Sequence, residues 1–81
     1  MSNYKHKLYI YDNNYYHAKE VIDAICFSLN MHSYQAEQCV EIAHNVGKSV
    51  IKESSKAKLL ELKNELRITL PELVTEIVKI D

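Results

Sequence analysis

Histidine and cysteine have the most versatile side chains in this sequence, since they can bind metals or act as bases and nucleophiles. The four histidines, His6, His17, His32 and His44, lack the short spacings of a zinc site. The chain has a single glycine, whereas a nucleophile elbow or a phosphate-cradling loop needs several. We therefore predict no metal site, no cofactor and no enzymatic activity.

Two polar features remain as candidate ligand-binding groups, His44 and the run Asp12-Asn13-Asn14. His44 falls near the end of a predicted helix, at the edge of its apolar stripe. A purely structural interpretation also fits, because the negative end of the helix dipole and Glu41 one turn earlier would stabilise a solvated histidine there. Asp and Asn side chains bond their own backbone, so the run also fits a plain turn. The residues alone leave both interpretations open.

The helix that carries His44 has a marked start and stop. Ser33 is suited to cap its first turn, and Gly47 stands where a left-handed C-terminal cap is expected. Between them, apolar residues recur at steps of three and four residues. They are Ala36, Cys39, Val40, Ala43 and Val46. This pattern predicts a helix with one buried face.

Two further helices are expected, one on each side of that element. Helical spacing begins at Ala18, and Phe27 broadens an already apolar surface, so we expect the first helix to be largely buried. The connector 30–32 is short enough to make the first two helices an antiparallel or steeply crossed pair. A third helix follows a Ser54-Ser55 cap and must end before Pro71.

Three segments have the composition of strands. Residues 7–11 alternate aliphatic and amphipathic side chains, residues 49–53 are rich in β-branched side chains, and residues 73–80 close the chain. The predicted order is therefore β-α-α-β-α-β. Strands this few, mixed with helices in this order, favour an α+β domain with a three-stranded, mainly antiparallel sheet and helices packed on one face.

Composition restricts the class of protein. With 81 residues, 47% of them hydrophobic and 26% charged, residues 1–81 are expected to form one globular domain behind a short N-terminal lead, residues 1–5. Lys+Arg 10 nearly balance Asp+Glu 11, so no broad basic field is available for nucleic acid. No stretch resembles a signal peptide or a membrane span, and Cys26 and Cys39 form no disulfide framework. We expect a cytoplasmic protein with reduced thiols, and neither a nucleic-acid nor a membrane partner.

Several short runs carry a resemblance to a known family. They are Val21-Ile22-Asp23-Ala24-Ile25, Gln35-Ala36, Gln38 and His44-Asn45-Val46-Gly47-Lys48. Together they resemble the core of the ClpS family, the adaptors that hand N-degron substrates to the Clp ATP-dependent protease in bacteria. The spacing from Val21 through Lys48 fits the family pattern without a gap, and residues 12–14 lie where that family has an Asn-Asp-Asp turn. The resemblance extends from about Lys5 to the last strand.

The resemblance implies a function and a set of site residues. ClpS-type proteins hold a free α-amino group with the turn and the helix histidine, which would here be Asp12, Asn13 and His44. The first side chain of the substrate enters an apolar pocket between two helices. The corresponding pocket residues are Tyr16, Ala18, Val21, Val40 and Ala43. The implied partners are a Clp-family AAA+ unfoldase and substrates with a hydrophobic N-terminal residue.

The sequence also departs from the family pattern. The acid has moved to Asp12, so the position usually credited with the ionic grip on the amine is Asn13. Ala18 replaces the methionine that gates the pocket, while Tyr16 and His17 add bulk, which fits either a reshaped pocket or none. The alternative function is therefore a protein-interaction module without degron recognition, either a diverged ClpS-like domain or one resembling the C-terminal domain of a ribosomal stalk protein.

Overall fold

The computed structural model describes residues 5–80, which form three strands and three helices. In chain order these are β1 (His6–Tyr11), α1 (Ala18–Leu29), α2 (Ser33–Val46), β2 (Lys48–Ser54), α3 (Lys56–Thr69) and β3 (Thr75–Lys79). This confirms the predicted order of elements. Most of the expected N-terminal lead, residues 1–4, lies outside the described residues.

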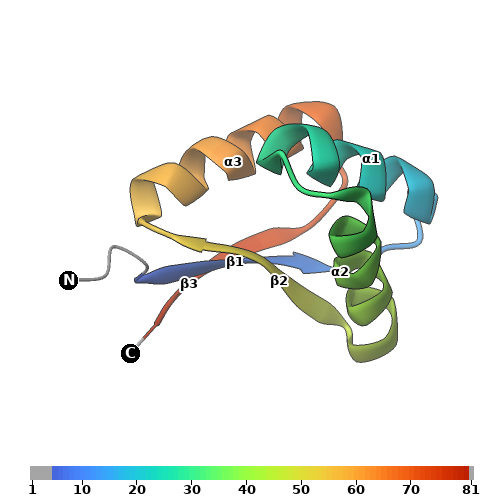
Figure 1. Ribbon diagram of the computed structural model, residues 1–81, viewed down its shortest axis with the longest axis horizontal. Coiled ribbons are helices and arrows are strands. Elements are labelled where there is room, and N and C mark those ends of the chain that lie inside the picture. Colours follow the sequence, from blue (N-terminus) through green and yellow to red (C-terminus); the bar gives the residue numbers. More distant parts are fainter. Residues whose placement is uncertain (1–4, 81) are drawn as a thin grey trace.

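The strands form a sheet of order β2-β1-β3, in which both neighbouring pairs are antiparallel. All three helices pack on one side of it, so the α+β prediction is confirmed (Figure 1). Helices α1 and α3 lie side by side along the sheet, and α2 crosses the end of the sheet where β1 ends and β2 begins (Figure 1). The loop after β1 therefore runs close to both α1 and α2.

The core lies between this helical layer and the sheet. On β1 the buried residues Leu8 and Ile10 alternate with partly exposed ones, so the strand presents one face to the helices. The helices contribute small and aliphatic side chains at helical spacing. The buried helical residues are Val21, Ala24, Ile25, Ala36, Ala43, Leu59, Leu62 and Leu66.

The helices are capped by the expected residues, with one correction. Ser55 caps α3 by accepting from the backbone N–H of Lys58, and Gly47 ends α2 in a left-handed conformation with φ of 108°. The prediction that Ser33 caps α2 is wrong, because the cap is His32. Its ring Nδ1 accepts from the backbone N–H of Tyr34 at 3.1 Å, so a ring nitrogen replaces the Ser33 hydroxyl as the acceptor of the cap.

Two apolar side chains predicted to face the core are exposed. Phe27 is 87% exposed because it follows the buried Val21 by six residues, which turns it about 240° around the helix. Val46 is 75% exposed, since it is the last residue of α2 and lies beside the Gly47 turn. Because Phe27 is exposed, α1 is buried along one face only and is not largely buried as predicted.

The last strand is shorter than the predicted segment 73–80. The N–H of Leu73 donates to the carbonyl of Leu70, which closes a turn around Pro71, so that β3 begins only at Thr75.

Cys26 and Cys39 are free thiols, and burial raises the pKa of Cys39. No helix within residues 5–80 is long and apolar enough to cross a membrane.

Candidate functional site

A cavity of about 350 Å³ opens where the loop after β1 meets α1 and α2. Its lining consists of Ile10, Tyr11, Asp12, Asn13, Asn14, Tyr16, His17, Ala18, Val21, Val40, Ala43 and His44. All eight residues predicted for the site lie in this lining. The fold therefore brings the loop residues and the helix residues together, although His44 and Asp12 are 32 positions apart in sequence.

The deep part of the cavity is apolar. Ile10 of β1 is 1% exposed, and Val21 of α1 and Ala43 of α2 are also buried, so three different elements supply aliphatic walls. Val40, one turn before Ala43 on α2, continues this wall and is half-buried. A surface of this kind accepts an apolar side chain and excludes charged ones, which would lose their hydration there.

Asp12 and His44 form the polar part of the opening. His44 lies in the last turn of α2, and its Nδ1 is 3.4 Å from Oδ1 of Asp12. Both side chains remain accessible, with exposed fractions of 75% for His44 and 40% for Asp12. The backbone N–H of Asp12 donates to the carbonyl of Gly47 at 2.9 Å, which fixes the loop to the end of the helix. The helix stop thereby sets the position of the carboxylate.

Asn13 is engaged inside the loop. Its Oδ1 accepts from the backbone N–H groups of Tyr15 and Tyr16, at 3.0 and 2.7 Å. These bonds make a turn in which a side-chain amide replaces backbone partners. Among residues 5–80, Asp12 is the only carboxylate that lines the cavity.

Tyr16 and Ala18 define the side of the cavity where the sequence departs most from the ClpS pattern. The hydroxyl of Tyr16 accepts from the backbone N–H of Glu72 at 2.9 Å, so the loop is also fixed to the turn between α3 and β3. Ala18 is the first residue of α1 and carries only a methyl group. Tyr16 therefore lines the cavity while its hydroxyl is held by the turn before β3.

Four lining residues were not among the eight predicted site residues, namely Ile10, Tyr11, Asn14 and His17, although Asn14 belongs to the candidate turn and His17 was expected to add bulk nearby. Ile10 could have been found, because strand alternation already placed it on the buried face next to the turn. Tyr11 has a second role on the other side of the sheet, where its hydroxyl donates to Glu76 of β3. That hydrogen bond is the main reason why the pKa of Tyr11 is raised above 10.0. Lys48 lies over the neighbouring Tyr9 ring.

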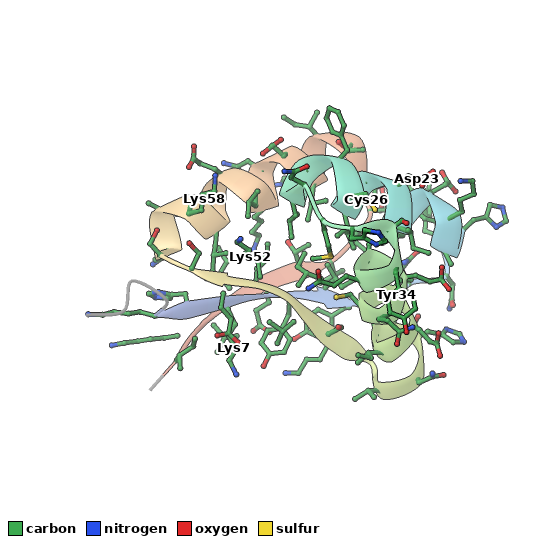
Figure 2. All side chains as sticks on the ribbon, in the orientation of Figure 1. Lys7, Asp23, Cys26, Tyr34, Lys52 and Lys58 are labelled. Atoms are coloured by element: carbon green, nitrogen blue, oxygen red, sulfur yellow. The ribbon has the colours of Figure 1, made fainter. Side chains whose placement is uncertain are left out.

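Two other observations concern the rest of the molecule. Within residues 5–80, no group of three or more His, Cys, Asp or Glu side chains is placed to hold a metal ion. A second, more open hollow lies beside the connection between α1 and α2, and Lys52 of β2, which is labelled in Figure 2, is one of the residues that line it. None of the predicted site residues lines it.

Comparison with known proteins gives a structural match alone. No protein-family model matches the sequence, and no curated protein does. Among solved structures, that of Agrobacterium tumefaciens ClpS2 bound to L-phenylalaninamide matches with a TM-score of 0.89 and 13% sequence identity. The match covers 96% of this chain and 99% of that chain. The chain therefore has a ClpS-like fold.

Proposed function

We propose that this chain is an adaptor that binds the free N-terminus of substrate proteins and delivers them to a Clp-family AAA+ unfoldase in the cytoplasm. The observation that carries the proposal is a single cavity that combines an apolar floor with the Asp12–His44 pair at its opening. The two halves of this cavity match the two halves of an N-terminal residue, which has an apolar side chain and a charged amine. A plain interaction surface requires no such combination.

The amine needs acceptors, because a cation that leaves water without them is strongly disfavoured. Asp12 supplies a carboxylate, and a bond from ammonium to a carboxylate is about twice as strong as one between neutral groups. If neutral His44 donates from Nδ1 to Asp12, its Nε2 remains as an acceptor. The opening can thus meet more than one N–H of the ammonium group.

The first side chain of the substrate would fill the apolar part. A volume of about 350 Å³ lies near the lower end of ordinary ligand sites, which span about 300–1,000 Å³. One large apolar side chain fits such a space, and a longer peptide does not. We expect Leu, Phe, Tyr and Trp to be accepted at the first position, and charged residues to be rejected.

The structural match supports the same chemistry. The ligand in the ClpS2 structure, L-phenylalaninamide, carries an amine beside an aromatic side chain. Delivery to an unfoldase rests on the ClpS-like fold and on the sequence resemblance. A pull-down with the tagged chain is therefore expected to recover a Clp ATPase, and recovery of other proteins alone would favour an interaction module without degron recognition.

Peptide titration tests the binding step directly. We expect a peptide that begins with Phe to bind at pH 7.5, and its N-acetylated form to bind at least about tenfold more weakly, because acetylation removes the charge-assisted bonds. His44→Ala should also weaken binding about tenfold. Asn45→Ala, the next residue on α2 and outside the cavity, serves as the matched control and should stay within about twofold. Equal affinity for the free and acetylated peptides would refute the proposal.

A further inference from the structure

Asp12 and Asn13 are neighbours in the turn, but their side chains are engaged differently. Both hydrogen bonds to the Asn13 carbonyl oxygen come from the backbone, one from Tyr15 and one from Tyr16. A carbonyl oxygen has two lone pairs, so this acceptor is fully used within the loop. What remains of the Asn13 side chain is its NH₂ group, which donates and cannot accept from an ammonium ion.

Asp12 is held in place without its carboxylate being used up. Its backbone N–H is fixed to the carbonyl of Gly47, while its side chain is 40% exposed and, among the described residues, forms a polar contact with the ring of His44 alone. The Oδ1–Nδ1 distance of 3.4 Å is long for a hydrogen bond, and such a contact can open to admit a ligand. The carboxylate is therefore accessible, oriented and next to a second acceptor.

We infer that Asp12 is the charge partner of the ligand's ammonium group, that it is shared with His44, and that Asn13 is a positioning residue that folds the turn. This inference rests on the proposed function and specifies how the site would work. It reverses the assignment that the family resemblance implies, in which the middle residue of the turn holds the amine. In this chain Asp12 would bind the amine, and Asn13 would hold the turn.

The arrangement makes binding depend on the proton of His44. A protonated His44 would pair with Asp12 and would place a second cation beside the ammonium. The other titratable side chains of the cavity are Tyr16 and His17 from the loop, and Glu41 lies one turn before His44 on α2. Tyr11 of β1 also lines the cavity, but its hydroxyl bonds Glu76 on the other side of the sheet. A peptide amine stays charged below about pH 7.7, so a loss of affinity in mild acid would arise in the protein.

The test is a titration of four variants with one peptide that begins with Phe, at pH 7.5. Asp12→Asn should weaken binding by about ten- to a hundredfold, the range for loss of a hydrogen bond to a charged group. Asn13→Ala should weaken it about tenfold because the turn is no longer held, whereas Asn13→Asp keeps the acceptor for both amides and should restore affinity to within about threefold. Asp23→Asn removes an exposed carboxylate on α1, outside the cavity, and should stay within about twofold (Figure 2).

The pH profile separates a direct role of His44 from a structural one. Between pH 7.5 and 5.5 the unmodified chain should lose about five- to tenfold in affinity, because a proton added to His44 would strengthen its pairing with Asp12 at the expense of the ammonium group. His44→Gln cannot be protonated, so its weaker affinity should change by less than about threefold. A profile for His44→Gln as steep as that of the unmodified chain would assign the pH dependence to His17 and overturn the shared Asp12–His44 site.

Two results distinguish the failure of this inference from the failure of the proposed function. If the unmodified chain binds the free peptide no better than the acetylated one, the proposed function fails and the inference fails with it. If the unmodified chain discriminates between the peptides, but Asp12→Asn keeps full affinity or Asn13→Asp binds more than about tenfold tighter, the amine is held at position 13 and the inference alone is wrong.

Discussion

The cavity has two walls of different physical character. The helical wall consists of Val21, Val40 and Ala43, which also belong to the core or pack against it. The loop wall, residues 12–17, is mostly exposed and is held by a small number of hydrogen bonds. Packing of the core therefore also forms the apolar part of the site, whereas the polar opening depends on the separate hydrogen bonds of the loop.

This difference predicts how each wall responds to substitution. A residue of the helical wall contributes to stability and to the site at once, so changing it alters the free energy of unfolding. A residue of the loop wall contributes little to the core, so changing it should alter binding with little effect on stability. The experiments below measure where this division holds and where it fails.

The largest effect is expected at the floor of the cavity. Ile10→Ala deletes a side chain that is 1% exposed and should destabilise the protein by about 2–5 kcal/mol, through lost burial and the space left behind. Asn14→Ala, an exposed residue of the loop wall in the same cavity, should change stability by no more than about 0.5 kcal/mol. Urea denaturation compares the two, and similar losses would show that the loop wall is part of the core.

An intermediate effect is expected at Gly47, where the two walls are joined. A Cβ at this position would meet no atom within 4 Å, so the penalty of substitution is the backbone strain of φ 108° alone. Gly47→Val should cost about 1–3 kcal/mol, and Gly47→Asn less, because asparagine enters the left-handed region more readily. Thermal unfolding checks this order. Equal losses for the two variants would mean that the glycine is needed for something other than its conformation.

Much of the fold could be predicted because local signals marked the ends of its elements. Gly47, Ser55 and Pro71 each act within one turn of the chain, so their effect does not depend on the tertiary structure. The periodicity of α2 likewise predicted that Val40 and Ala43 lie on its apolar face, whereas their place in the pocket was implied by the resemblance. Val46 was misplaced because a stripe at helical spacing does not reveal where the sheet beneath it ends.

The polar half of the site could be predicted only in part. The residue types and the resemblance indicated Asp12, Asn13 and His44, but not how the three divide the hydrogen bonds among them. That division depends on contacts between distant segments, such as Asp12 with Gly47 and Asp12 with His44. Asp, Asn and His can each accept or lose a partner at little local cost, so sequence alone leaves their arrangement open.

The smallest and most informative effect is expected at Tyr16, where the loop wall is fixed to the turn before β3. Tyr16→Phe removes the acceptor for the N–H of Glu72, and because Glu72 is exposed, water can replace that bond and stability should fall by no more than about 1 kcal/mol. Order in the loop should suffer more than stability. Amide hydrogen exchange at Tyr15 and Tyr16 should accelerate, since both amides donate to Asn13 in a turn that has lost its outer support.

Tyr15→Phe is the matched control, because the Tyr15 side chain is 71% exposed and makes no hydrogen bond through its hydroxyl in the described structure. In Tyr15→Phe, amide hydrogen exchange at residues 15 and 16 should remain unchanged. If Tyr16→Phe also leaves both amides protected, Asn13 alone holds the turn, and hydrogen bonds within the loop are then sufficient to keep the loop wall ordered. If protection falls, the polar opening depends on a contact 56 residues away, which explains why its geometry could not be predicted from the local sequence.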